Sequence, residues 1–326
     1  MIKFILKKIG KLAGLLFAIS LLSFTLISYS PVDPVRSYVG AEVSKISPEQ
    51  RKNIEDYWGL NQSKPEQFML WGKALLQGNL GNSLIYREPV SEIISNRFSA
   101  SIALMGIAWV LSGILGFLLG VFAGMNEGSF IDRFIKSFSF ILASTPSFWF
   151  GLLLLMVFAA WLGWFPVGLA APAGSITSEV GFFDKMKHLV LPVLTLSIGG
   201  VASIALHTRS KLIEVLNSEF IRFARAKGES GTRLLWRHGL RNISLPAISL
   251  HFASFGELFG GAVLTEQVFS YPGLGQAVVK AGLGADIPLL LGITLFSVIF
   301  IFIGNFLADL LYVVIDPRMK TKASHG

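Results

Sequence analysis

Six long apolar stretches constrain the fold of this chain more than any other feature. They run approximately over 9–29, 99–125, 136–163, 188–208, 245–269 and 288–315. Each is of the length that a helix needs to cross the hydrocarbon core of a bilayer. Because lipid offers the backbone no hydrogen-bond partners, all six are expected to be helical. The sequence therefore predicts an all-α membrane protein with about six transmembrane helices.

The composition agrees with a membrane protein. Hydrophobic residues make up 52% of the chain and charged residues 15%, whereas soluble domains carry about 25% charged residues. The chain has no cysteine, which excludes a disulfide framework, a thiolate metal site and a cysteine nucleophile. The net charge of +8 would suit nucleic-acid binding, but the basic residues lie beside the apolar stretches. Membrane topology explains them better.

The first apolar stretch has two interpretations. Four lysines precede the run 12–27, and Ser28-Tyr29-Ser30 loosely resembles a signal-peptide cleavage site. The apolar core of a signal peptide is usually shorter, about 7–15 residues, and here further spans follow. We therefore expect a retained first helix.

Lysines and arginines alternate between the two sides of the apolar stretches. On one side, the N-terminus holds four, 126–136 two, 209–242 eight and the tail after residue 316 three. On the other side, 164–187 holds two and 270–287 one. Short loops rich in Lys and Arg remain on the cytoplasmic side of a bilayer. A multi-pass protein with both termini and 209–242 in the cytoplasm is the expected topology.

The stretch 30–98 is expected to lie on the opposite side and to contain two short helices, over about 48–57 and 65–77. Ser47-Pro48-Glu49 has the pattern of a helix start. The two helices would present a common apolar surface formed by Ile54, Tyr57, Trp58, Phe68, Leu75 and Leu76. This surface could cap the membrane helices or bind an external partner.

Glycines and prolines mark packing and bending in the spans. Gly116, Gly120 and Gly124 recur every four residues, a spacing that lets helix backbones approach closely. Prolines within or at the start of the later spans each remove a helical hydrogen bond, so each marks a kink or the beginning of a span. They are Pro146, Pro192, Pro246 and Pro288.

The basic segment 209–242 is much longer than a connection between antiparallel helices requires. A helix is predicted over 211–226, a left-handed turn at Gly228, and a second helix over 231–241 capped by Ser230. The segment could be a basic amphipathic hairpin on anionic lipid. Alternatively it is a rigid lever that docks in another protein, since apolar anchors among basic residues suit a protein interface.

Residues 220–228, which read Phe-Ile-Arg-Phe-Ala-Arg-Ala-Lys-Gly, together with 236–242 and Leu245-Pro246, resemble the coupling motif of ABC importers. Arg-Phe-Ala at 222–224 replaces the general Glu-Ala-Ala opening, and the gap to the Leu-Pro pair is longer, as in dipeptide, oligopeptide and nickel permeases. In that family the segment docks on the ATP-binding subunit. The resemblance implies this coupling role for Arg222, Ala224, Arg225, Ala226, Lys227, Gly228, Trp236, Arg237, His238, Arg241 and Pro246.

The resemblance to this family covers nearly the whole chain. It includes 58–62, 76–83, Pro89-Val90, the loop 266–275, and the closing residues from Asp286-Ile287-Pro288 to Asp316-Pro317-Arg318. One departure is Val32 in Pro31-Val32-Asp33-Pro34, where the family more often has glycine. The implied fold is a type I ABC importer permease (MetI-like) core with an N-terminal extra helix and an extracytoplasmic helical insertion, in a prokaryotic plasma or inner membrane.

The expected organisation has four parts. Residues 1–30 form a cytoplasmic start and the first span, and 31–98 form the extracytoplasmic helical region. Residues 99–315 form the permease core of five spans, including the coupling segment 209–246. The remainder, 316–326, is a cytoplasmic tail.

Nothing in the sequence indicates an enzyme. It lacks the phosphate-binding loop of ATPases, and its histidines are scattered rather than arranged as metal ligands. No cofactor is expected in this chain. The resemblance implies that partner subunits bind and hydrolyse ATP with magnesium.

Ionisable and polar residues inside spans are costly and mark transport pathways or internal partners. Glu257, Asn305, Asp309 and His207 are the candidates for the translocation pathway, and internal pairing is the alternative. Glu257 is the first choice because it is a carboxylate among aromatic and apolar residues.

The resemblance implies an importer permease for dipeptides or oligopeptides. Its partners would be a homologous second permease subunit, two ATP-binding subunits and an extracytoplasmic substrate-binding protein. Nickel, cobalt or a metal–chelator complex remains an alternative cargo, and no Cys/His cluster supports binding of a bare soft metal. A stand-alone channel, an ion-coupled carrier and a membrane-anchored scaffold are rivals that need no ATPase dock.

Overall fold

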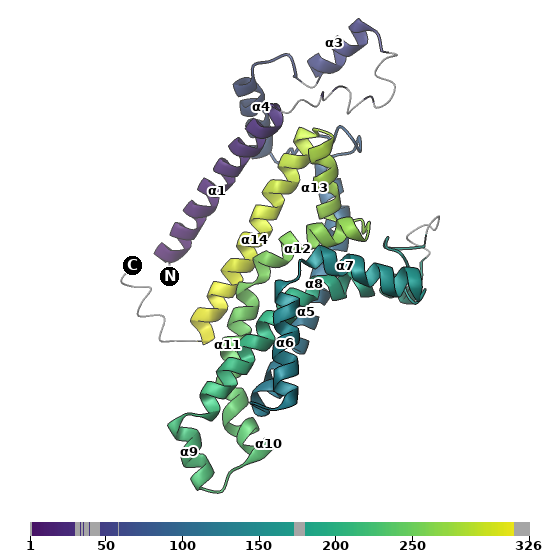
Figure 1. The fold of residues 1–326 in the computed structure, drawn as a ribbon. Helices are drawn as coiled ribbons and strands as arrows, with labels where there is room; N and C mark the ends of the chain where they lie inside the picture. Colours follow the sequence, from purple (N-terminus) through teal and green to yellow (C-terminus); the bar gives the residue numbers. More distant parts are fainter. Residues whose placement is uncertain are drawn as a thin grey trace. The chain divides into compact units, whose positions relative to one another are not determined.

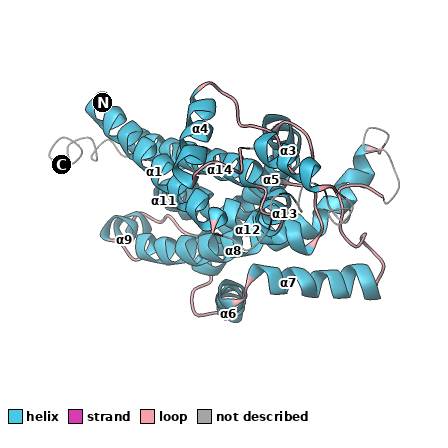
Figure 2. Cartoon of the chain, turned by 90° about the horizontal axis from the view of Figure 1, so that it is seen from above, coloured by secondary structure: helices cyan, strands magenta, loops and turns pink. Residues whose placement is uncertain are grey.

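The computed structural model describes residues 2–29, 33, 35, 39, 46–57, 59–172 and 180–315, and all its regular elements there are helical (Figures 1 and 2). In chain order the elements are α1 (Ile2–Ser28), α3 (Pro48–Tyr57), α4 (Lys64–Leu76), α5 (Val90–Met125), α6 (Phe130–Ser144), α7 (Ser147–Leu154), the π-helical η2 (Leu155–Trp161), α8 (Phe182–Leu216), α9 (Glu219–Ala226), α10 (Gly231–Leu234), the π-helical η3 (Leu235–Gly239), α11 (Leu240–Ala253), α12 (Phe255–Val268), α13 (Leu274–Leu283) and α14 (Ile287–Ile315).

The predicted number of spans is confirmed, with a difference in their form. Four helices within the described residues, α1, α5, α8 and α14, are long and apolar enough to cross a membrane. Two further spans are bent pairs, α6 with α7–η2 and α11 with α12, which brings the total to as many as six. The all-helical membrane fold predicted from the sequence is therefore correct.

The bends fall only partly at prolines. The first pair turns by 106° between Ser144 and Ser147, where Pro146 follows the last residues of α6, and Figure 2 shows α6 nearly end-on while α7 lies in the plane. Pro288 lies in the first turn of α14, as expected for the beginning of a span. The second pair turns by 50° at Ser254 rather than at Pro246, which lies inside α11.

The chain divides into two compact units, one of Met1–Ser101 with Pro272–Phe302 and one of Ile102–Tyr271 with Ile303–Gly326. The helices α5 and α14 each contribute to both units. The four-part organisation expected from the sequence stays a prediction.

The first unit is organised around Asp286, which is fully buried just before α14. Its carboxylate accepts hydrogen bonds from the Ser83 hydroxyl at 2.5 Å, the Ile85 backbone N–H at 3.0 Å and the Leu289 backbone N–H at 3.1 Å. The last of these caps α14, because a side-chain oxygen three residues upstream satisfies a helix N–H. An apolar core from α5, α13 and α14 lies beside it, formed by Val90, Ile93, Ile94, Leu274, Ala277, Ala281, Leu289 and Ile293.

The two short helices predicted in 30–98 are present as α3 and α4. A capping box begins α3: the Ser47 hydroxyl accepts from the Gln50 N–H, and the Gln50 side chain accepts from the Ser47 N–H. On α4, Phe68 packs on Phe24 of α1 with ring centroids 5.2 Å apart. Leu76, by contrast, is 91% exposed. Trp58 lies outside the described residues, so the predicted common surface stays a prediction.

The second unit is built around α8. Of the residues in its most apolar window, 67% are buried, against 11% in α1. The helices α6, α7, α11 and α12 pack on it. The α5 glycine stripe also meets α8: a Cβ added at Gly116 would lie 2.9 Å from the Val201 carbonyl oxygen, and one at Gly120 would lie 2.7 Å from the Ala205 carbonyl oxygen. Only glycine permits this close approach, as its spacing predicted.

Candidate functional site

The candidate site is the segment after α8, which folds as a helical hairpin. We call residues 217–241 the coupling hairpin. Its first arm is α9, and its second arm is α10 with η3, which runs directly into α11. The single helix predicted over 211–226 is wrong, because α8 ends at Leu216 and α9 begins at Glu219. Between them the Ser218 hydroxyl donates to the Val215 carbonyl at 2.5 Å, a local bond that competes with helix continuation.

The predicted left-handed turn at Gly228 is confirmed, with φ of +87°. The Gly228 N–H donates to the Arg225 carbonyl at 2.9 Å, and the Glu229 N–H donates to the Ala224 carbonyl at 3.2 Å. These two bonds form a Schellman motif, which ends a helix and satisfies its last carbonyls. The turn therefore reverses the chain sharply between the two arms.

A small apolar interior holds the two arms together. Ile221 and Ala224 of α9 and Leu234 of α10 are buried against one another. Val215 and Leu216, at the end of α8, pack against the same cluster. Ala224 thus belongs to the interior of the hairpin rather than to its surface. The arms pack on the last turn of α8, the most buried of the four long helices described.

The exposed surface of the coupling hairpin, which we call its outer face, carries large aromatic side chains and cations. Phe223 is 63% exposed and Trp236 is 73% exposed. The Lys227 ammonium lies 4.5 Å from the centre of the Phe223 ring, a cation–π contact, and Arg222 pairs with Glu219 at 3.1 Å. Of the residues singled out from the sequence, those exposed on the hairpin are Arg222, Arg225, Ala226, Lys227, Gly228, Trp236 and Arg237.

Glu229 links the turn to the second arm, and sequence reasoning missed it. Its carboxylate lies 3.0 Å from both the Arg237 guanidinium and the His238 Nε2 atom. His238 is therefore half-buried beside Glu229 rather than on the exposed face. An acidic residue directly after a helix-ending glycine, within an otherwise basic segment, was the available signal.

Three further residues singled out from the sequence lie at or near the hairpin; the predicted cap at Ser230 is wrong, and the roles of the other two stay predictions. Ser230 occupies the N-cap position of α10, but its side chain makes no capping hydrogen bond. Pro246 is half-buried inside α11. Arg241 lies at the beginning of α11, and its side chain is outside the described structure.

A buried ion pair supports α8 just before the hairpin. The Arg209 guanidinium makes two contacts with the Asp132 carboxylate of α6, one of them at 2.8 Å between Nη2 and Oδ2. Asp132 is 2% exposed and also accepts a bond from the Gly128 N–H at 2.9 Å. Bidentate pairs of this kind fix geometry as well as charge. The pair joins two spans at the root of the coupling hairpin.

The pathway candidates lie on three helices, α12, α14 and α8, and the first two of these touch. Glu257 is exposed in the first turn of α12, directly after the bend at Ser254. On α14, Asn305 is exposed and Asp309 is half-buried; Gly304 lies against the Phe255 ring, so α14 and the start of α12 are in contact there. His207 is half-buried in α8. The contact between Phe255 and Gly304 therefore brings the segments that contain Glu257 and Asn305 together.

Two family models match this chain, and one solved structure has a similar fold. The family described as "Binding-protein-dependent transport system inner membrane component" matches residues 116–321, and its N-terminal counterpart matches residues 1–105. The fold is similar to that in "Inward facing conformations of the MetNI methionine ABC transporter", with a TM-score of 0.56 and 15% identity, covering 69% of this chain and 97% of that chain.

Curated relatives match along almost their whole length. The oligopeptide transport system permease protein AppB of Bacillus subtilis (strain 168) is 36% identical, covering 94% of this chain and 95% of that protein. The di/tripeptide transport system permease protein DppB of Pseudomonas aeruginosa (strain UCBPP-PA14) is 34% identical, covering 98% of this chain and 99% of that protein. The chain belongs to the family of binding-protein-dependent transport system inner membrane components.

Proposed function

We propose that this chain forms half of the translocation pathway of an ATP-driven peptide importer and that its coupling hairpin docks on an ATP-binding subunit. The observation that carries the proposal is the outer face of the hairpin. Exposed Phe223 and Trp236 stand among cations on a helical element with its own apolar interior. Aromatic anchors with a charged surround are typical of protein interfaces.

The connection of the hairpin to the spans supports a mechanical role. A force on α9 passes through Ile221 to Val215 and Leu216, the last turn of α8. From α8 it passes to α6 through the Arg209–Asp132 pair and to α5 through the glycine stripe. Closely packed elements transmit displacement because they resist deformation. Closure of the ATP-binding subunits would thereby tilt the spans between outward and inward access.

The rest of the machinery lies outside this chain. A homologous second permease would complete the pathway, two partner subunits would bind and hydrolyse ATP with magnesium, and an extracytoplasmic binding protein would deliver substrate. This chain would have no catalytic role. Both termini would be cytoplasmic, since the charge distribution favours that orientation. The end of α1 and the start of α14 also line one cavity. These two ends would therefore lie on the same side of the membrane, and the ends that lead to the two termini would lie together on the other side.

Peptides are the proposed cargo because the relatives named above are oligopeptide and di/tripeptide permeases. Among the described residues, no group of three or more acidic or histidine side chains could hold a metal ion. Competition between a labelled dipeptide, a longer peptide and a nickel–chelator complex for uptake by the assembled transporter tests the cargo directly. Uptake of the nickel complex alone would contradict this assignment.

Glu257 is proposed to line the pathway together with Asn305. Both residues are exposed on helices that touch at Phe255 and Gly304, and Glu257 lies directly after the bend at Ser254. Ionisable residues inside spans usually face a cavity or a partner. Glu257→Gln should slow uptake and weaken substrate-stimulated ATPase activity while leaving assembly intact. Glu92→Gln, at an exposed position in the first turn of α5 and outside the coupling hairpin, is the matched control for loss of one carboxylate.

The docking claim is tested by truncating the anchors. Phe223→Ala combined with Trp236→Ala should reduce the amount of ATP-binding subunit that co-purifies with the chain, without loss of the inserted chain itself. Phe130→Ala is the control, because Phe130 is 83% exposed at the beginning of α6. Equal co-purification of the ATP-binding subunit with all three proteins would overturn the docking role.

A further inference from the structure

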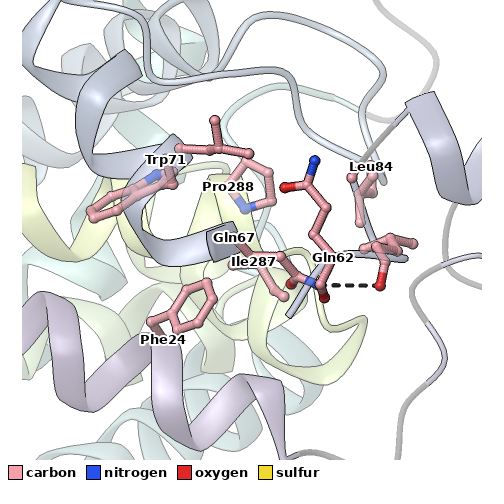
Figure 3. Close-up of a pocket in the computed structure, with 10 residues that line it drawn as sticks. Phe24, Gln62, Gln67, Trp71, Leu84, Ile287 and Pro288 are labelled. Carbon is pink, nitrogen blue, oxygen red and sulfur yellow. Dashed lines mark hydrogen bonds between the residues drawn. The ribbon is translucent and has the colours of Figure 1, made fainter. Parts of the chain in front are cut away.

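A cavity of about 190 Å³ lies within the first unit, between α1, α4 and the start of α14 (Figure 3). It is larger than the apolar cavities of about 150 Å³ that accept a benzene-sized guest. The lining is mostly apolar and comes from helices and loops far apart in the sequence, principally Phe24, Leu60, Leu70, Trp71, Leu84 and Ile287. Among the residues that the structure describes, no lysine, arginine, aspartate or glutamate lines it.

The cavity lies at the end of two membrane spans. Phe24 is close to the end of the apolar window Lys8–Leu26 of α1, and Ile287 begins the apolar window Ile287–Leu310 of α14. The hydrocarbon core of a bilayer gives way to the headgroup region at such ends. A ligand of this cavity would therefore lie at the membrane interface.

One polar atom in the cavity wall has no partner. The indole Nε1 of Trp71 is buried and makes no hydrogen bond in the described structure. A buried donor without an acceptor is costly, and tryptophan is typical of the membrane interface, where its ring meets acyl chains and its N–H meets polar groups.

The wall is pre-formed, and α4 exposes large apolar side chains beside it. The Gln67 side-chain amide donates to the Leu60 carbonyl at 3.1 Å and to the Gln62 carbonyl at 2.9 Å, which holds the preceding loop against α4. Met69 and Leu70 of α4 are 72% and 52% exposed. Large apolar side chains gathered at one exposed site mark a contact with a membrane or a partner.

We propose that this cavity binds one acyl chain of a phospholipid, which lies against the Trp71 ring. The bound chain fastens α1 to the start of α14. Such a fastening suits α1, because few residues of its apolar window are buried in the chain and its contact with α4 depends on the Phe24–Phe68 ring pair. The neutral lining selects the apolar part of the lipid rather than its charged headgroup.

Quenching of tryptophan fluorescence by brominated acyl chains tests the proposal. The assembled transporter is placed in nanodiscs of phosphatidylcholine with or without bromine on the acyl chain, and the emission of Trp71 is obtained by subtracting that of Trp71→Phe. The Trp71 emission should lose most of its intensity in brominated lipid. Leu60→Phe, which fills the cavity, should restore it, and Leu76→Phe, at an exposed position of α4 outside the lining, should not.

Mass spectrometry of the detergent-purified transporter provides a second readout. The original chain and Leu76→Phe should retain one phospholipid more than Leu60→Phe, and Leu84→Phe serves as a second filling variant. Trp71 emission that is unquenched, or that is quenched equally when the cavity is filled, would overturn the proposal. So would an effect on Trp71 only upon addition of the external substrate-binding protein, since the cavity would then be a protein docking site.

Discussion

Two acidic residues each organise a reversal of the chain, and they do so in opposite surroundings. Asp286 is fully buried and accepts from three donors that come from two distant parts of the sequence. Glu229 remains partly exposed and pairs with Arg237 and His238, which are its neighbours along the hairpin. The first residue holds a fold together, whereas the second stabilises the shape of a surface.

The apolar side chains around the two residues differ in the same way. Near Asp286 they form the closed core of α5, α13 and α14. On the coupling hairpin, only a small interior is closed, and Phe220, Phe223 and Trp236 remain exposed. Large apolar side chains grouped on an exposed surface mark a contact with a partner or a membrane. The comparison distinguishes a region that determines the stability of the fold from a region that determines the binding of a partner protein.

The largest effect is expected from Asp286→Ala. It would leave the Ser83 hydroxyl and the Ile85 and Leu289 N–H groups without an acceptor in a buried site, and each unsatisfied donor costs about 1–3 kcal/mol. We expect a marked fall in thermal stability and in the yield of folded chain, measured by thermal unfolding in detergent. Asp286→Asn, which retains one acceptor oxygen, should be less severe. Unchanged stability of Asp286→Ala would remove the distinction between the two regions.

Gly228→Pro is expected to lower thermal stability less than Asp286→Ala does. Its effect on transport should be large. Proline cannot adopt the left-handed conformation of Gly228 and lacks the N–H that bonds to Arg225. The turn between the arms should be displaced, so that peptide uptake falls by roughly tenfold, the effect of about 1.4 kcal/mol, while the chain still inserts. Uptake assays in vesicles measure this.

Gly228→Asn is the control for this prediction, because asparagine tolerates the left-handed conformation. It should retain most of the uptake. Normal uptake by Gly228→Pro, or equal loss by both variants, would show that the geometry of the turn is not what transport requires.

The smallest effect is expected from Glu229→Gln. The Arg237 side chain is 64% exposed, and ion pairs with an exposed partner contribute at most about 1 kcal/mol. Thermal stability should therefore change little, whereas amide exchange at 228–238 should become faster, which hydrogen-exchange mass spectrometry measures. A loss of stability as large as that of Asp286→Ala would mean that the hairpin is part of the folding core.

Much of the fold could be predicted from the sequence because lipid restricts the choice to helices. The spans, the close approach at Gly116 and Gly120, the capped start of α3 and the turn at Gly228 are local or periodic features, and each was predictable. The break at Ser254 was not, because no proline marks it. The role of Asp286 depends on Ser83, a residue 203 positions away, and spacing alone does not indicate such a pairing.

The location of the candidate site was predictable from the sequence, but which of its residues are buried and which are exposed was not. The resemblance located the coupling hairpin, but it treated Ala224 and Trp236 alike, although the first is buried and the second exposed. Which face of a short helix is covered depends on what packs against it. Here Leu234 and the end of α8 decide that face, and their contacts with α9 are tertiary.

The central claim is that the outer face of the coupling hairpin contacts an ATP-binding subunit during transport. Because the chain has no cysteine, Ala226→Cys and the control Met69→Cys, on exposed positions of α9 and α4, each introduce a single reactive thiol. With a short bifunctional reagent in membranes that are importing peptide, Ala226→Cys should crosslink to the ATP-binding subunit and Met69→Cys should not. Capture of lipid alone from Ala226→Cys, in membranes where uptake is active, would contradict the account.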